Sequence, residues 1–254
     1  NDDRDDTLRY IASELAKAGQ FDKAFDVAGF IYDNYYKAWA LKDIAVELAK
    51  TGQTQKALQI FDKAVNAAGS ISDDSDKASA LINIASELAE AGQTQKALLI
   101  FDDALNAAGS ISDDRYKALT LIDIASELAK AGQFGIAFDV AGSISDNYYK
   151  ARALKDIAVE LAKAGQTQQA LLIFDKAVNV AGSIYDNYDK ADTLINIASE
   201  LAKAGQTQQA LQIFDKAFDV AGSISNDFLK FSALINIASE LAKAGQFDKA
   251  VTVA

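Results

Sequence analysis

Glutamates that recur at one position of the sequence are the residues most suited to binding a cation or forming ion pairs. The same local context carries a glutamate seven times, and a lysine follows three residues later in six cases. One interpretation is a ladder of cation-binding carboxylates. The other, which we favour, is pairing of each glutamate with that lysine on one helix face, because glutamates a helix pair apart lie too far from each other to share an ion. The glutamates are Glu14, Glu47, Glu87, Glu127, Glu160, Glu200 and Glu240.

Short aspartate-rich segments, such as Ser-Asp-Asp-Ser-Asp at residues 72–76, invite a calcium interpretation. An EF-hand loop needs a central glycine and a distal glutamate, and both are missing here. An aspartate or serine directly before a helix commonly caps it, since its side chain accepts hydrogen bonds from the first free backbone N–H groups. We therefore interpret Asp73 or Ser72 as an N-cap and expect no metal site.

Catalytic motifs are missing from the sequence. His and Cys are both absent, so the usual pairs of a nucleophile and a base cannot form. No P-loop, nucleophile elbow, zinc-protease motif or dinucleotide-binding glycine fingerprint occurs. The prominent carboxylates recur in every repeat, whereas an active site would require residues that break the repeat. We expect no catalytic residue, no cofactor and no enzymatic activity.

Charge and composition argue against further classes of function. Lys+Arg number 25 and Asp+Glu number 36, a net charge of −11, which disfavours nucleic acid because phosphates attract basic surfaces. No apolar run reaches the roughly 18 residues that a membrane helix needs. No targeting segment is visible and the chain contains no Met, so we expect a processed product or a fragment, and the localisation stays open.

The elements that must position these residues are repeats. A glycine followed by glutamine recurs at intervals of 33, 40, 40, 33, 40 and 40 residues. The segments from Gly19 to Gly132 and from Gly132 to Gly245 both span 113 residues, so the array has a second, longer period. We predict a single repeat domain over residues 1–254. Its seven repeats cover approximately residues 1–31, 32–71, 72–111, 112–144, 145–184, 185–224 and 225–254.

In each repeat the spacing of apolar residues predicts a first helix with a broad apolar face. In the third repeat Leu81, Ile84 and Leu88 follow the spacing of one helical face. The helix is expected from about residue 74 to 91, with Gly92 in the left-handed conformation that ends many helices.

A second helix is predicted in each repeat, for example at about residues 54–68, with Gly69 ending it. In the first, fourth and seventh repeats the seven residues equivalent to 54–60 are missing. Seven residues correspond to about two helical turns, so the apolar face keeps its phase and the helix becomes shorter. We therefore expect three short second helices.

The pattern resembles the tetratricopeptide repeat, an antiparallel helix pair of about 34 residues. The tryptophan and proline of that family's signature are missing, and Gly109 stands where the family usually has proline. The resemblance implies an all-α fold, a right-handed α-solenoid of seven antiparallel helix pairs. It rests, in the third repeat, on Leu81, Asn83, Ile84, Ala85, Leu88, Gly92, Ala97, Phe101 and Ala104.

In tetratricopeptide folds the first helices line the concave surface, so the resemblance implies a partner-binding groove here. Basic or aromatic patches would alternate with apolar ones, which suits an extended or helical peptide with some acidic character. The alternative is that the isoleucines only pack inside a tight superhelix. The implied lining comprises Arg9, Trp39, Lys42, Val46, Ile82, Ser86, Leu119, Ile122, Arg152, Lys155, Val159, Asp192, Ile195 and Ile235.

Aromatic residues gather beside the short repeats. They could form a docking patch, since Tyr and Trp dominate interface hot spots. They could instead fill the volume vacated by the missing helical turns, as close packing demands, and we favour this filling. The residues concerned are Tyr32, Tyr35, Tyr36, Tyr148 and Tyr149.

The leading prediction for function is a non-enzymatic scaffold that binds a protein or peptide partner through the concave groove. The competing prediction is a structural subunit that stacks end to end into fibres or arrays. Near-identical repeats favour it, as do Phe247, Ala250 and Val251 on the last predicted helix. We expect this helix to fray in a monomer or to be covered by a second molecule, with self-association as the result.

Overall fold

The computed structural model describes residues 2–253 and contains only helices within that range. The described residues form fourteen α-helices, in which a first and a second helix alternate along the chain, and no strand occurs among them. The all-α class expected from the sequence is therefore confirmed. The chain divides into two compact units, Asn1–Ala131 and Gly132–Ala254, which are described separately. One continuous domain over the whole chain stays a prediction.

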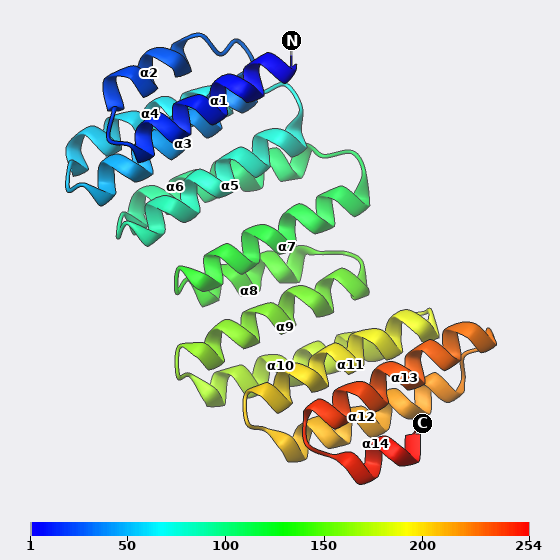
Figure 1. Ribbon diagram of the computed structural model, residues 1–254. Helices are drawn as coiled ribbons and strands as arrows, with labels where there is room; N and C mark the ends of the chain where they lie inside the picture. The colour runs from blue at the N-terminus through cyan, green and yellow to red at the C-terminus, as the bar shows by residue number, and fades with distance from the viewer. Residues whose placement is uncertain (1, 254) are drawn as a thin grey trace. The chain divides into compact units, whose positions relative to one another are not determined.

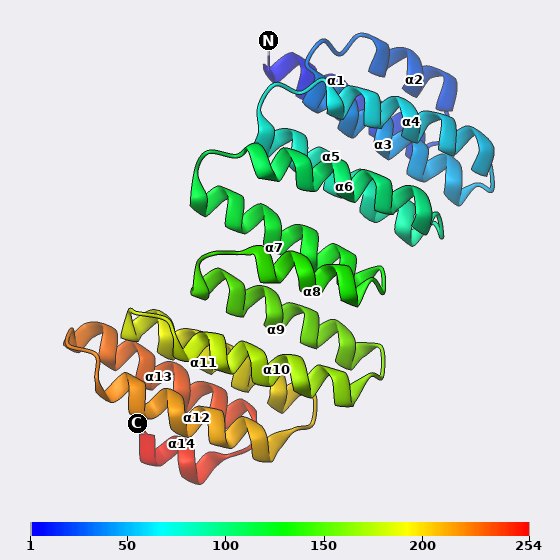
Figure 2. The ribbon, with the colours of Figure 1, turned by 180° about the vertical axis from the view of Figure 1, so that it is seen from behind.

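The first unit consists of seven helices in two layers. The odd-numbered helices lie side by side in one layer, and the even-numbered helices form a second layer, behind them in Figure 1 and in front of them in Figure 2. Each even-numbered helix packs against the helix before it and the helix after it. The helices are α1 (Asp2–Lys17), α2 (Phe21–Gly29), α3 (Asn34–Lys50), α4 (Thr54–Gly69), α5 (Asp74–Glu90), α6 (Thr94–Ser110) and α7 (Asp114–Lys130).

The second unit repeats this arrangement. The first helices α9, α11 and α13 pack against one another in sequence, and each forms a hairpin with the second helix that follows it. The helices are α8 (Phe134–Ser143), α9 (Asn147–Lys163), α10 (Thr167–Gly182), α11 (Asn187–Lys203), α12 (Thr207–Gly222), α13 (Asp227–Lys243) and α14 (Phe247–Val253).

Aspartate caps begin most of the first helices, as expected for Asp73. Its Oδ1 accepts hydrogen bonds from the backbone N–H groups of Ser75 and Asp76, each at 2.9 Å. This satisfies donors that the first turn of a helix leaves free, and it accounts for the aspartate-rich segments. The same cap occurs at Asp33, Asp113, Asp146 and Asp186.

A left-handed glycine follows each first helix. Gly92 has a φ of 76°, and the N–H of the next residue, Gln93, donates to the carbonyl of Leu88 at 2.8 Å. This is the hydrogen bond of a Schellman turn, and a side chain at such a φ would be strained. Gly69 differs, because it is the last residue of α4 and has no positive φ.

The short second helices are confirmed. Helices α2 and α8 have 9 and 10 residues, against 16 in α4 and 17 in α6. The apolar face keeps its phase, since Ala24 and Ala28 of α2 are still buried. Helix α14 has 7 described residues.

The core of each long hairpin is aliphatic around one phenylalanine. Phe61 and Phe101 in the first unit, and Phe174 and Phe214 in the second, are almost fully buried. A buried side chain of this size stabilises the fold by about 1.5–3 kcal/mol. First helices contact neighbours on several sides, so α5 buries seven residues and leaves a narrow exposed stripe.

Candidate functional site

The expected groove residues lie on the first helices, some along the stripe that is not buried and others between helices. Buried positions on these helices are nearly the same in every repeat, mostly alanine, leucine and isoleucine. The stripe changes from one helix to the next instead. One position of the stripe shows this variation. In the first unit it is occupied by Trp39 on α3, Ser79 on α5 and Leu119 on α7, and in the second unit by Arg152 on α9, Asp192 on α11 and Ser232 on α13.

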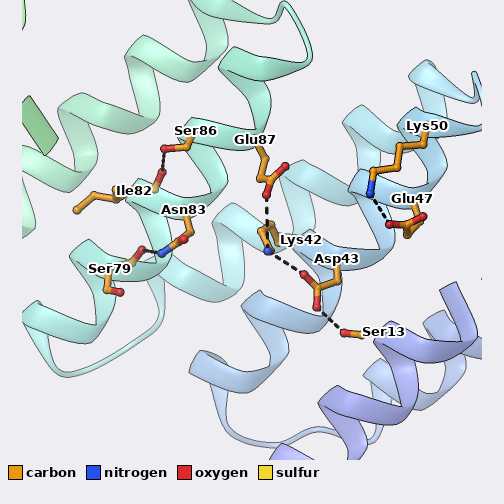
Figure 3. Close-up of polar contacts among 10 residues, drawn as sticks. All are labelled: Ser13, Lys42, Asp43, Glu47, Lys50, Ser79, Ile82, Asn83, Ser86 and Glu87. Carbon is orange, nitrogen blue, oxygen red and sulfur yellow. Dashed lines mark hydrogen bonds and ion pairs between the residues drawn. The ribbon is translucent and has the colours of Figure 1, made fainter. Parts of the chain in front are cut away.

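In the first unit a polar chain centred on Lys42 connects α1, α3 and α5 (Figure 3). The Nζ of Lys42 lies 2.8 Å from Oδ1 of Asp43 and 3.9 Å from Oε1 of Glu87. The hydroxyl of Ser13 donates to Oδ2 of Asp43. Lys42 is only 9% exposed, and its Nζ lies 4.9 Å from the ring centroid of Trp39. This lysine is thus engaged within the unit by two carboxylates and an aromatic ring.

Glu87 is the exception in the glutamate column, because residue 90 is Glu where the other repeats have Lys. Burial raises the pKa of Glu87, Lys42 lowers it, and the negative charge of Glu90 raises it again, with a net upward shift. The other glutamates form the expected ion pairs three residues apart, at 2.5–2.8 Å. The pairs are Glu14–Lys17, Glu47–Lys50, Glu127–Lys130, Glu160–Lys163, Glu200–Lys203 and Glu240–Lys243.

The second unit contains a small polar pocket between α9 and α11, with a volume of about 230 Å³. The Nδ2 of Asn196 donates to the carbonyl oxygen of Asp192 at 2.8 Å and to its Oδ2 at 3.0 Å. The Nζ of Lys155 lies 2.7 Å from Oδ1 of Asp156, so its charge is largely neutralised. The pocket is lined by Tyr148, Ala151, Arg152, Lys155, Asp192, Thr193, Asn196 and Ile197.

Asp192 is a half-buried carboxylate of this pocket. Within residues 2–253 neither Asp192 nor Arg152 forms an ion pair, although both line the pocket. Burial raises the pKa of Asp192, and the hydrogen bond from Asn196 opposes that shift without cancelling it. Burial also raises the pKa of Tyr148, which senses the charges of both Asp192 and Arg152. The Tyr148 hydroxyl therefore lies within electrostatic reach of both charges.

The isoleucines of the expected groove lie in two different environments. Ile82, Ile122 and Ile195 are buried between helices, and their burial favours the packing interpretation for these three. Ile235 on α13 is 49% exposed. For Ile82 and Ile195 the physical reason is that α5 and α11 each pack against a first helix on both sides, whereas α13 packs against α11 alone among the first helices of its unit.

The remaining residues of the expected lining are spread over both units. Arg9 forms an ion pair with Asp6 at 2.8 Å. Val46 and Leu119 are half-buried, and the hydroxyl of Ser86 donates to the carbonyl of Ile82 at 2.9 Å. Val159 lines a second, more apolar pocket of about 380 Å³ among α9, α10 and α11.

None of the five tyrosines beside the short repeats is fully buried. Tyr32 is exposed, and the Tyr35–Tyr36 and Tyr148–Tyr149 pairs are only half-buried, with ring centroids 5.6 and 5.2 Å apart. Whether they fill the vacated volume or form a docking patch stays a prediction.

Hollows along the short helix α2 are what the sequence reasoning missed. Two depressions of about 630 and 410 Å³ lie where α2 runs beside the longer α4. The ring of Phe25 borders both of them, and the Nζ of Lys63 lies 4.2 Å from its centroid. Phe138 and Lys176 repeat this contact at 4.2 Å in the second unit. The missing seven residues were the available signal, since a shortened helix leaves space beside a full-length neighbour.

No helix within residues 2–253 has the length and apolar character needed to cross a bilayer. No three or more Asp or Glu side chains in the same range are grouped so that they could hold a metal ion.

Comparison with known proteins yields one family and several structural likenesses. A family model described as tetratricopeptide repeat matches residues 36–110, and no curated protein matches the chain in sequence. Ton1535 from Thermococcus onnurineus NA1 is 20% identical, with 97% of this chain and 84% of that chain covered and a TM-score of 0.46. A Rap protein complexed with Competence and Sporulation Factor is 16% identical, with 99% and 75% covered and a TM-score of 0.38. The apo quorum sensor NprR from B. thuringiensis is 14% identical, with 98% and 86% covered and a TM-score of 0.36.

The matched segment runs from the first turn of α3 to the end of α6, which is two complete helix hairpins. The left-handed glycine that closes the first helix of these hairpins recurs in both units. So do the buried alanines and the phenylalanine of the long second helices. The same hairpin is repeated beyond the matched residues, so the rest of the described chain shares the helix-pair architecture of the segment that is similar to the tetratricopeptide repeat.

Proposed function

We propose that this chain is a non-enzymatic interaction scaffold that binds an extended or helical segment of a partner protein on the face formed by its first helices. The main support for the proposal is that the repeats differ mainly at exposed positions of the first helices and much less at buried ones. Buried positions are nearly constant, whereas the exposed stripe presents a ring at Trp39, a cation at Arg152 and a carboxylate at Asp192. Packing alone does not require such variety, but recognition of a non-repetitive segment does.

The partner segment is expected to carry mixed chemistry rather than a dominant negative charge. The acidic character expected from the sequence depended on Lys42 and Lys155. Each of these lysines is paired with the aspartate that follows it, at 2.8 and 2.7 Å. A cation that already has a close carboxylate contributes little attraction to a second one.

The test exchanges stripe residues for residues that other repeats already hold at the same position. Trp39→Ser together with Arg152→Ser copies Ser79 and Ser232, so the hairpins are expected to fold normally. We expect this variant to lose a partner that the unchanged chain captures in an affinity pull-down. Circular dichroism melting checks that the helices are intact.

A matched control changes the opposite layer. Leu99 and Leu172 are 68% and 64% exposed on second helices, and Gln59 and Gln212 occupy the same repeat position. Leu99→Gln together with Leu172→Gln is expected to leave capture unchanged. Loss of the partner in this control, with full capture by the Trp39→Ser, Arg152→Ser variant, would assign binding to the second helices and refute the proposal.

A second candidate function, self-association, is favoured by the exposed apolar side chains of α13 and α14. Phe231 is 62% exposed, whereas Ala191 at the same repeat position is buried. Phe228 and Phe247 are exposed as well. Sedimentation at increasing concentration tests this candidate: growth in mass that Phe231→Ala suppresses would support it, and a constant monomer mass would exclude it.

A further inference from the structure

We propose that the pocket between α9 and α11 receives one basic side chain of the bound segment, with its ammonium or guanidinium group on the carboxylate of Asp192. This inference rests on the proposed function and specifies the chemistry of the partner in the second unit. Three observations support the inference: the size of the pocket, the negative charge of its half-buried carboxylate, and the serine at the equivalent position of the first unit.

The size of the pocket fits a single side chain. Its volume of about 230 Å³ lies below the range of about 300–1,000 Å³ that is usual for small-molecule sites. The lining residues come from only two helices, α9 and α11, and include the exposed Arg152, so the pocket borders the exposed stripe of α9. The occupant is therefore a side chain that projects from a segment lying along the stripe.

The half-buried charge of the pocket that has no ion pair is negative. Lys155 is neutralised by Asp156, and Arg152 is exposed, where water screens its charge. Asp192 is half-buried, and Asn196 donates to its Oδ2 only, so Oδ1 accepts no hydrogen bond from residues 2–253. A half-buried carboxylate without a counter-ion is unfavourable, and a cation from the partner removes that penalty.

The equivalent place in the first unit shows that packing does not require this carboxylate. Ser79 stands 113 residues before Asp192, and the Nδ2 of Asn83 donates to its carbonyl at 2.8 Å, as Asn196 does to Asp192. The local backbone arrangement is thus the same without an acidic side chain. The carboxylate of Asp192 caps no helix and pairs with no cation of the described chain, which leaves recognition as its role.

The experiment uses the full chain, labelled with ¹⁵N, and follows the side-chain amide of Asn196, which touches Asp192 directly. The probes are the blocked peptides acetyl-Ala-Ala-Lys-Ala-Ala-amide and acetyl-Ala-Ala-Glu-Ala-Ala-amide. The lysine peptide is expected to shift the Asn196 resonances in a saturable manner, and the glutamate peptide is expected to leave them in place. Asp192→Asn is expected to weaken binding of the lysine peptide about tenfold.

Two further variants sharpen the outcome. Asp175→Asn removes the same charge from an exposed place on α10 and is expected to change nothing. Ser79→Asp adds the carboxylate to the first unit and is expected to make Asn83 respond to the lysine peptide. Asp192→Ser, which copies Ser79, replaces Asp192→Asn if that variant fails to fold.

Equal binding of the lysine peptide by the unchanged chain and by Asp192→Asn would overturn the inference, and so would tighter binding of the glutamate peptide. This failure is distinguishable from failure of the scaffold function. Partner capture that depends on Trp39 and Arg152, without any lysine preference in the pocket, would leave the scaffold standing and remove only the assignment to Asp192.

Discussion

Lys42 of α3 and Glu87 of α5 face each other across adjacent first helices, with Nζ 3.9 Å from Oε1. Glu87 is available for this contact because the residue three positions on is Glu90, where six other repeats have lysine. A single substitution in the repeat thereby converts a contact within one helix into a contact between two repeats.

Glu90→Lys is expected to restore the pair within α5 and to draw Glu87 away from Lys42. Exposed pairs of this kind contribute up to about 1 kcal/mol, so the free energy of unfolding should rise by no more than that. Urea denaturation measures it. Lys130→Glu, the reverse change on α7, should lower stability by a similar amount, and a drop in stability for both variants would contradict the assignment.

Gly92→Ala is expected to destabilise the chain by about 1–2 kcal/mol, because the left-handed φ of 76° is unfavourable for a residue with a Cβ. Gly69→Ala provides the matched control. Its φ is not positive and an added Cβ would meet no atom within 4 Å, so stability should stay constant or rise by up to about 1 kcal/mol. Thermal melts of both variants measure the two changes in stability. An equal loss of stability in both variants would show that the left-handed turn conformation is not the cause.

Asp192→Asn is expected to stabilise the free chain at neutral pH, by no more than about 1 kcal/mol for a half-exposed charge. Burial raises the pKa of Asp192 in the folded state above its ordinary 3.8. On raising the pH through that value, the unfolded chain loses its proton first, so the carboxyl lowers stability as pH rises. The gain from Asn should therefore shrink as pH falls through the raised pKa toward 3.8 and be absent below 3.8, which denaturation at several pH values measures.

Helix α14 is expected to exchange its backbone amide hydrogens faster than α12. It has 7 described residues and buries only Ala250, whereas helices shorter than about 12–15 residues are marginal in water without packing. Hydrogen exchange followed by mass spectrometry of the peptides that cover the two helices measures the difference. Equal protection at low concentration would contradict the expected fraying, and protection that grows with concentration would indicate self-association.

The sequence by itself determined the repeats, the helix pairs, the N-cap at Asp73, the left-handed Gly92 and the shortened α2 and α8. These features depend on neighbours within a few turns, so their residue types and spacing carry the information. The glutamate pairs were predictable for the same reason, since three residues along a helix bring two side chains together.

Only the tertiary structure decided which side chains of different repeats meet. The burial of Ile82, the approach of Lys42 to Glu87, and the pocket that brings Asp192 and Arg152 together all depend on how neighbouring first helices pack. Residues 40 positions apart become neighbours only once that packing exists, because a shift of one helix by a turn would give each of them another partner. The hollows beside α2 follow the same rule, since only the packed structure shows whether side chains fill the space left by missing turns.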